Sequence, residues 1–302
     1  MNVKRNWYAA QVAAPAKINL GLDILERRED GFHEVRTIMQ SIELHDVVSV
    51  TLRRGPCTVR SPSVGDMPQD RGNLVWMVLE RLWRSIGWSG EPHGVAVTVT
   101  KRIPTKAGLG GASSDAAAVL RALVRLWCPT LQREVVHDVA ESVGSDVPFF
   151  LNGGTAVATG RGECVRRLPS LHRLWLVIAV PSFGVSTKAA YDWWDGGFRP
   201  ELSRCELSRG WRRRLDRLTN DLEYVVTERY PEIGEMVSRL RIADASFASM
   251  TGSGSAVFGA FQSHAAALRA RRRVRQKGWR TLITKTVTLT EFRSLARLAL
   301  IE

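Results

Sequence analysis

Runs of apolar and β-branched residues recur along the chain with the length and spacing of β-strands. They lie at 12–20, 46–52, 95–101, 155–159, 174–180, 246–250, 255–261 and 281–287. Short apolar runs of this kind, bounded by polar residues, glycine or proline, predict strands. We therefore expect a strand in each of these segments.

Between the strands, apolar residues recur at the three- and four-residue intervals of helices. The clearest helix is expected from Ser114 to Trp127, where Ala116, Leu120 and Leu123 share its apolar face and Ser-Ser-Asp supplies a cap and an acidic first turn. Further helices are expected near 73–86, 132–143, 187–195, 216–229, 231–241 and 263–276. Strand pairs mixed with helices, instead of strict alternation, predict an α+β fold.

A chain of 302 residues exceeds the size at which one core usually stops growing, so we expect two domains, at 1–160 and 161–302. The longest apolar run, 174–180, is too short to cross a membrane. The N-terminus lacks the apolar core of a signal peptide, so we expect a cytoplasmic protein. Four cysteines without a CxxC pair predict free thiols and no zinc site; they are Cys57, Cys128, Cys164 and Cys205.

The formal net charge of +13 raises the possibility of nucleic-acid binding, since arginine is concentrated in 209–217 and 269–280. Apolar residues interrupt both runs at helical intervals, and no zinc-finger or RNA-recognition signature accompanies them. We therefore favour solvated helix faces, with attraction of phosphate or nucleic acid as the alternative.

One segment, "KAGLGGASSDAAA" at 106–118, joins the strand at 95–101 to the helix from Ser114. Its glycines let backbone amides approach a ligand, and a helix N-terminus presents unpaired N–H groups, so the segment predicts an anion site. Ser113 and Ser114 could cap the helix or bind phosphate, and positive charge is expected from Lys101, Arg102 and Lys106. The segment matches neither the P-loop pattern nor a complete GxGxxG.

Two polar residues elsewhere have both a structural and a chemical interpretation. In "APAKINLGL", Lys17 and Asn19 share one face of the strand, opposite Ala16, Ile18 and Leu20. Lys17 is then either an exposed strand residue or a functional cation. Asp146 precedes a proline at an expected helix start, where it is either a helix cap or a functional carboxylate.

Three segments together resemble the galactose, homoserine, mevalonate and phosphomevalonate kinases: "APAKINLGLDIL", "PTKAGLGGASSDAAA" and "MTGSGSAVFGAF". More narrowly, "PAKINLGLDILERREDGFHEVRTIMQSIELHD", "GSDVPFFLNGGTAVATGRGE" and "NDLE" resemble the 4-diphosphocytidyl-2-C-methyl-D-erythritol kinases of non-mevalonate isoprenoid synthesis. The likeness runs from about residue 12 to about residue 290.

This resemblance implies an N-terminal domain like ribosomal protein S5, a ferredoxin-like C-terminal domain, and transfer of the γ-phosphoryl of ATP, with Mg²⁺, to the substrate's 2-hydroxyl. It makes Lys17 and Asp146 the catalytic residues, with the aspartate accepting the hydroxyl proton. The residues that it assigns to ATP are Pro104, Ala107, Gly108, Leu109, Gly110, Gly111, Ala112, Ser113 and Ser114.

For the substrate, the resemblance implies that Phe32 stacks on cytosine and that His33 hydrogen-bonds to it. Phe32 replaces a tyrosine common in that family, which keeps the stacking face and loses a hydroxyl. Further substrate candidates are Asn19, Thr187 near a phosphate, and Tyr191 stacking on the other face of the base. Gly252 and Gly254 are expected to form a second tight turn near the loop. The alternatives are a sister kinase for homoserine or mevalonate, and a nucleic-acid-binding protein on an inactive kinase fold.

Overall fold

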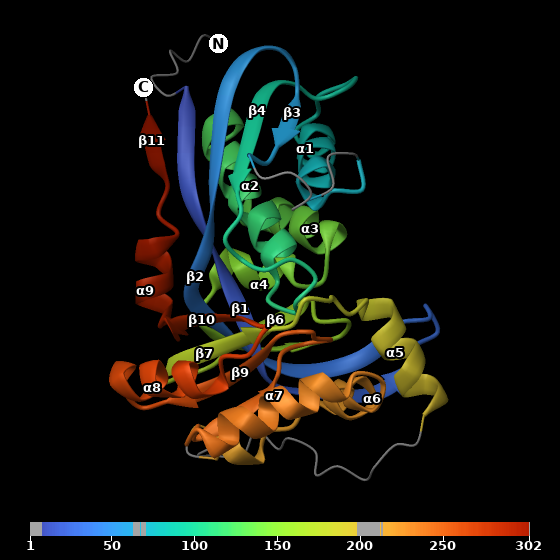
Figure 1. Ribbon diagram of the computed structural model, residues 1–302. Helices are drawn as coiled ribbons and strands as arrows, with labels where there is room; N and C mark the ends of the chain where they lie inside the picture. Colours follow the sequence, from blue (N-terminus) through green and yellow to red (C-terminus); the bar gives the residue numbers. More distant parts are fainter. Residues whose placement is uncertain (1–7, 63–66, 68–70, 198–211, 213, 302) are drawn as a thin grey trace.

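The computed structural model describes residues 8–62, 67, 71–197, 212 and 214–301. Within them the chain forms one sheet of seven strands and one of four (Figure 1). The seven-stranded sheet consists of β1 (Ala9–Arg27), β2 (His33–Pro56), β3 (Thr58–Arg60), β4 (His93–Thr100), β5 (Thr155–Thr159), β6 (Cys164–Arg167) and β11 (Ala299–Ile301). Its main path runs β11-β1-β2-β4-β3, and β5 pairs with β2 and β6.

The antiparallel β1–β2 hairpin is long enough to extend through both halves of the molecule. In Figure 1 it descends from the helices α1, α2 and α3 to the region beneath α5. Its pairing shifts between Pro15 and Lys17 and again between Asn19 and Gly21. Such bulges redirect side chains and are common beside active sites. Lys17 and Asn19 therefore lie between two irregularities in the β1–β2 pairing.

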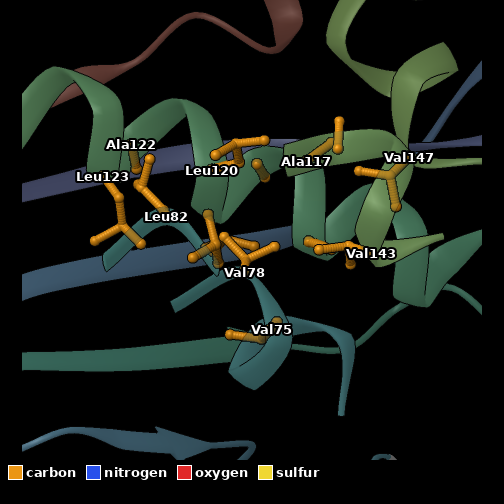
Figure 2. Packing of buried hydrophobic residues seen from close by; sticks show 14 of the residues in the cluster. Val75, Val78, Leu82, Ala117, Leu120, Ala122, Leu123, Val143 and Val147 are labelled. Atoms are coloured by element: carbon orange, nitrogen blue, oxygen red, sulfur yellow. The ribbon is translucent and has the colours of Figure 1, made fainter. Parts of the chain in front are cut away.

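Four helices pack beside the seven-stranded sheet: α1 (Leu74–Ser85), α2 (Gly111–Trp127), α3 (Arg133–Val143) and α4 (Val147–Asn152). Figure 2 shows side chains of α1 pointing toward α2, with α3 and α4 closing the side of the cluster. The labelled residues are Val75, Val78, Leu82, Ala117, Leu120, Ala122, Leu123, Val143 and Val147. Helix α2 is buried along most of its length from Ser114 onward, so the core fixes its position while its first three residues stay open.

The second sheet contains β7 (Trp175–Val180), β8 (Phe247–Met250), β9 (Val257–Phe261) and β10 (Arg280–Lys285) in the order β10-β7-β9-β8. Its helices are α5 (Thr187–Gly196), α6 (Asp221–Arg229), α7 (Pro231–Ile242) and α8 (His264–Val274), with a 3₁₀ turn η2 (Leu215–Arg217). This βαββαβ succession with its strand order is ferredoxin-like. The last helix, α9 (Leu289–Leu295), leads back to β11 in the first sheet.

The α+β prediction and all eight predicted strands are confirmed, but 12–20 and 46–52 prove to be parts of much longer strands. The helix predicted over 216–229 is wrong in its first part. Asn220 has an extended backbone and its side chain accepts a hydrogen bond from the Leu222 N–H, so α6 begins only at Asp221. The division at residue 160 stays a prediction, since β6 and β11, both beyond it, belong to the first sheet.

The arginines of α8 lie on an exposed face, while Ala267, Ala270 and Val274 are buried, which confirms a solvated helix over 269–274. The helix ends there, and 275–280 lead into β10. Most of 209–213 lies outside the described residues, as does Cys205. Cys57, Cys128 and Cys164 are free thiols. Within the described residues, no helix combines the length and the apolar content needed to cross a bilayer.

Candidate active site

The glycine loop packs directly against two other segments, and this contact explains its glycines. Gly108 and Gly110 have φ of 73° and 70°, a region that residues with a Cβ rarely adopt. A Cβ on Gly108 would lie 2.0 Å from the Thr251 carbonyl oxygen. On Gly110 it would lie 2.7 Å from the Phe150 ring and 3.0 Å from Cγ of Lys17. The loop is therefore seated against the lysine strand and the turn after β8.

Helix α2 begins at Gly111, with left-handed Gly110 as its cap residue. The prediction that Ser-Ser-Asp caps this helix is wrong, because the Ser114 hydroxyl donates to the Pro15 carbonyl at 2.7 Å. Asp115 lies beyond the first turn. A helix start without a side-chain cap leaves its first N–H groups to other partners, and those groups attract anions. The predicted anion site is thus compatible with the geometry.

Lys17 and Asp146 come together beside this loop. Nζ of Lys17 lies 3.5 Å from Oδ2 of Asp146, with the lysine side chain 5% exposed and the aspartate side chain 30% exposed. The interpretation of Lys17 as an ordinary exposed residue is therefore wrong. Asp146 does precede α4, but among the described residues its side chain makes no capping hydrogen bond. Its carboxylate faces the lysine.

Asn19 links the lysine to both halves of the molecule. Its Oδ1 accepts from Lys17 Nζ at 2.5 Å, and its Nδ2 donates to Oγ1 of Thr37 at 2.7 Å. Its backbone N–H donates to Oγ1 of Thr251 at 3.0 Å, and that hydroxyl lies 3.2 Å from the Gly108 carbonyl. The strand, the glycine loop and the β8–β9 turn therefore converge on one residue.

The turn between β8 and β9 is tight, as predicted. The Gly254 N–H donates to the Thr251 carbonyl at 3.0 Å, and the Ala256 N–H donates to Ala107 of the glycine loop at 3.2 Å. A Cβ on Gly252 would lie 3.3 Å from Nζ of Lys17. The second glycine turn therefore closes the lysine's side of the site.

Lys101 does not supply the free positive charge that was expected near the loop. Its Nζ donates to Asp46 at 2.5 Å and to Asp115 at 2.7 Å, and all three side chains are buried. Asp46 also accepts from the backbone of Arg102 and Ile103. Burial raises the pKa of Asp115 to about 7, against the opposing pull of Lys101. Lys106 is exposed, so its charge remains available.

The substrate candidates form a second group. Phe32 is 54% exposed, with the guanidinium of Arg161 5.1 Å above its ring. His33 is buried; its Nε2 lies 2.7 Å from Oδ1 of Asp195, and its ring stacks on Tyr191 with centroids 5.1 Å apart. Phe32 is thus open to solvent, whereas His33 is held in place by its neighbours.

The charge of Asp146, beside Lys17, acts on Tyr191 in the group of substrate candidates. Burial raises the pKa of the Tyr191 hydroxyl, and the charges of Asp146 and Asp221 raise it further. The prediction that Tyr191 stacks on the substrate base stays a prediction; the structure places its ring against His33. Thr187 begins α5, and its hydroxyl lies 2.9 Å from that of Ser253 in the second glycine turn.

Four residues of this site were not predicted: Thr37, Arg161, Asp195 and Thr251. Asp195 had a detectable signal, because it lies four residues after Tyr191 and therefore on the same face of α5. The other three lie inside the segments that carry the family resemblance, but their partners depend on strand register and turn geometry.

The described residues contain no group of three or more His, Cys, Asp or Glu side chains placed to hold a metal ion.

Comparison with known proteins agrees with the geometry. Residues 73–154 match the GHMP kinases N terminal domain, and residues 205–279 match the GHMP kinases C terminal domain. The chain is 36% identical over 277 residues to 4-diphosphocytidyl-2-C-methyl-D-erythritol kinase of Geobacter sulfurreducens, covering 91% of this chain and 98% of the relative. It is 40% identical over 283 residues to the same kinase of Pelotomaculum thermopropionicum, covering 90% and 96%.

A crystal structure of 4-(cytidine 5'-diphospho)-2C-methyl-D-erythritol kinase superposes with a TM-score of 0.77 at 34% identity, covering 91% of this chain and 98% of that one. The match therefore extends through both sheets. The chain belongs to the 4-diphosphocytidyl-2-C-methyl-D-erythritol kinase family within the GHMP kinases.

Proposed function

We propose that this kinase transfers the γ-phosphoryl of ATP to the 2-hydroxyl of 4-diphosphocytidyl-2-C-methyl-D-erythritol, giving the 2-phosphate and ADP for non-mevalonate isoprenoid precursor synthesis. The observation that carries the proposal is the Lys17–Asp146 pair, at 3.5 Å, beside the glycine loop at the start of α2. A cation and a carboxylate next to an anion site are what transfer of a phosphoryl group to an alcohol requires.

The triphosphate is assigned to the loop from Pro104 to Ser114, where Gly108 and Gly110 expose backbone and α2 presents its first N–H groups. Mg²⁺ would be held by phosphate oxygens with the hydroxyl of Ser113 in the first turn of α2. When bound, it would neutralise charge on the triphosphate as the γ-phosphoryl departs. The buried Ser114 hydroxyl supports the loop through Pro15 instead of facing outward.

In the chemical step, the substrate's 2-hydroxyl gives its proton to Asp146 while its oxygen forms a bond to the γ-phosphorus. The bond from that phosphorus to the leaving ADP oxygen breaks in line with the attack. Lys17 stabilises the negative charge that develops on the attacking oxygen. The 30% exposure of the Asp146 side chain leaves the carboxylate accessible to an incoming hydroxyl.

At the nucleoside end, exposed Phe32 offers a stacking face for cytosine. Asp195 accepts the Nε2 hydrogen of His33, so in the neutral imidazole Nδ1 is left as an acceptor for an amine of the base. Arg161, above the Phe32 ring, is a candidate for the substrate's diphosphate. Thr187 and Tyr191 stay substrate candidates through their contacts with Ser253 and His33.

The direct test is the release of ADP from Mg-ATP with three acceptors: 4-diphosphocytidyl-methylerythritol, homoserine and mevalonate. We expect turnover with the first alone, and mass spectrometry should find one added phosphate on that product. Turnover with homoserine or mevalonate, or none with the cytidine compound, would contradict the assignment. Family membership favours the cytidine substrate over those of the sister kinases.

We also propose that the partner is this small molecule, without nucleic acid or membrane, and that the reaction takes place in the cytoplasm. The exposed arginines of α8 are then a solvated face. Binding to duplex DNA should be weak and fall steeply between low and physiological salt, without sequence preference. Sequence-specific binding that persists at physiological salt would support the alternative.

A further inference from the structure

The amide of Asn19 has two orientations of nearly equal shape, and only one suits its surroundings. With Oδ1 toward Lys17, the amide accepts the hydrogen bond of an ammonium, which can only donate. With Nδ2 in that place, two donors would face each other in a site where Asn19 is 2% exposed and Lys17 is 4% exposed. Something must therefore select the first orientation.

Thr37 provides that selection through the single proton of its hydroxyl. Oγ1 of Thr37 donates to the Gly21 carbonyl at 2.7 Å, so its proton is committed. Toward Asn19 it can then act only as an acceptor, and it receives Nδ2 at 2.7 Å. The opposite end of the amide, Oδ1, is thereby turned toward Lys17.

The hydroxyl is itself held in place by the sheet. Thr37 is 3% exposed, and it pairs with Leu22 of β1 on one side and with Ala158 of β5 on the other. A β-branched side chain on such a strand has little rotameric freedom. The bulge between Asn19 and Gly21 brings the Gly21 carbonyl within reach of the hydroxyl instead of leaving it in a regular ladder.

We propose that Thr37 is a positioning residue for phosphoryl transfer, which fixes the amide of Asn19 and, through it, the ammonium of Lys17. This inference rests on the proposed role of Lys17 in the reaction. Thr37 itself contacts neither reactant. A purely structural role, in which the hydroxyl only satisfies the Gly21 carbonyl, predicts a loss of stability and no specific loss of turnover.

The test compares Thr37→Val, which removes the hydroxyl and keeps the shape, with Thr37→Ser, which keeps the hydroxyl. We expect Thr37→Val to lower kcat by roughly 10- to 100-fold, the scale of a misplaced catalytic group, with the KM for ATP changed less than about threefold. Thr37→Ser should restore most of the turnover. An unchanged kcat in Thr37→Val would overturn the proposal.

Thr155→Val is the matched control. Thr155 is also 3% exposed, and its hydroxyl donates to Gln40 at 2.6 Å and accepts from the Leu171 N–H, so its hydrogen bonds involve neither Asn19 nor Lys17. It should lose thermal stability as Thr37→Val does, while keeping its kcat. An equal loss of kcat in both variants would also overturn the proposal, because general loosening would then explain the effect.

Asn19→Asp makes the test specific to orientation. A carboxylate presents an oxygen to Lys17 whichever way it turns, so Thr37→Val should lower kcat less than about threefold in that background. An effect as large as in the wild-type background would refute the orientation argument. If Thr37→Val does not fold, Thr37→Cys takes its place in both comparisons. A wild-type protein inactive on the cytidine substrate would instead refute the proposed function, so the two failures are distinguishable.

Discussion

Two lysines, Lys17 and Lys101, flank the same glycine loop, and they differ in the number and the exposure of their carboxylate partners. A Cβ on Gly110 would lie 3.0 Å from Cγ of Lys17, and a Cβ on Gly111 would lie 3.3 Å from Nζ of Lys101. Both ammonium groups are buried. Lys17 faces one carboxylate at 3.5 Å that is open to solvent, whereas Lys101 is held by two buried carboxylates within 2.7 Å.

The Lys101 cluster connects three elements. Asp46 belongs to β2, Lys101 follows β4, and Asp115 lies in α2, so their bonds fix the start of the helix against the sheet. The ammonium of Lys101 is shared between the two buried carboxylates, and a buried pair of this kind is costly to break. At Lys17 the carboxylate is farther away and 30% exposed, which leaves room beside it for a substrate hydroxyl. This looser pairing fits the catalytic role proposed for Lys17 and Asp146.

The largest effect is expected on the Lys17 side. Asp146→Asn removes the proton acceptor while keeping the shape of the side chain, so turnover should fall by roughly 10²–10⁴-fold. The affinity for ATP should stay within about threefold, because the glycine loop and α2 are intact. Steady-state kinetics and nucleotide titration measure the two quantities. Unchanged turnover would show that Asp146 has no part in the proton transfer.

On the Lys101 side, the main effect should be on stability. Lys101→Met leaves Asp46 and Asp115 buried without their cation, which should lower the free energy of unfolding by about 3–5 kcal/mol. Urea denaturation measures this change. Lys17→Met is the matched variant: its partner Asp146 is 30% exposed and can be hydrated, so the loss should be smaller while turnover collapses. Equal losses of stability in both variants would remove the distinction between the two sides.

The sequence predicted the surroundings of Lys17 better than those of Lys101. The residue types of the glycine loop predicted an anion site, the family resemblance added Lys17 and Asp146 to it, and the structure brings the three together. Lys101 was expected to add positive charge near the loop, because it lies close to the loop in the chain. Its partners Asp46 and Asp115 lie 55 and 14 residues away, and only the packing of β2 against β4 and α2 reveals them.

The same limit applies to the hydrogen bonds around Asn19. Alternation along a strand predicts that Lys17 and Asn19 share a face, and they do. It does not predict the bulges that bring Gly21 and Thr37 together, nor the turn that places Thr251 beside Asn19. The long β1 and β2 strands were underestimated because polar residues along both strands interrupt the apolar pattern on which strand prediction depends.

The smallest expected effect concerns the pH dependence of stability. Burial raises the pKa of Asp115 to about 7, above the ordinary value of an aspartate. Between about pH 4 and pH 7 the folded protein therefore holds a proton that the unfolded chain has released, and raising the pH through this window costs stability. Asp115→Asn abolishes this contribution. As the pH rises, the free energy of unfolding of the wild type should fall, relative to that variant, by at most about 1.4 kcal/mol per pH unit, the limit for one proton.

Urea denaturation at intervals from pH 5 to pH 8 measures the difference. Asp192→Asn is a suitable control, since it removes a 58%-exposed carboxylate from a surface pair with Lys188 and should change stability by less than about 0.5 kcal/mol. If the curves of wild type and Asp115→Asn run parallel across this range, Asp115 is ionised throughout. The Lys101 cluster would then carry a fixed net negative charge beside the start of α2, and the loop would have to bind its anion against that charge.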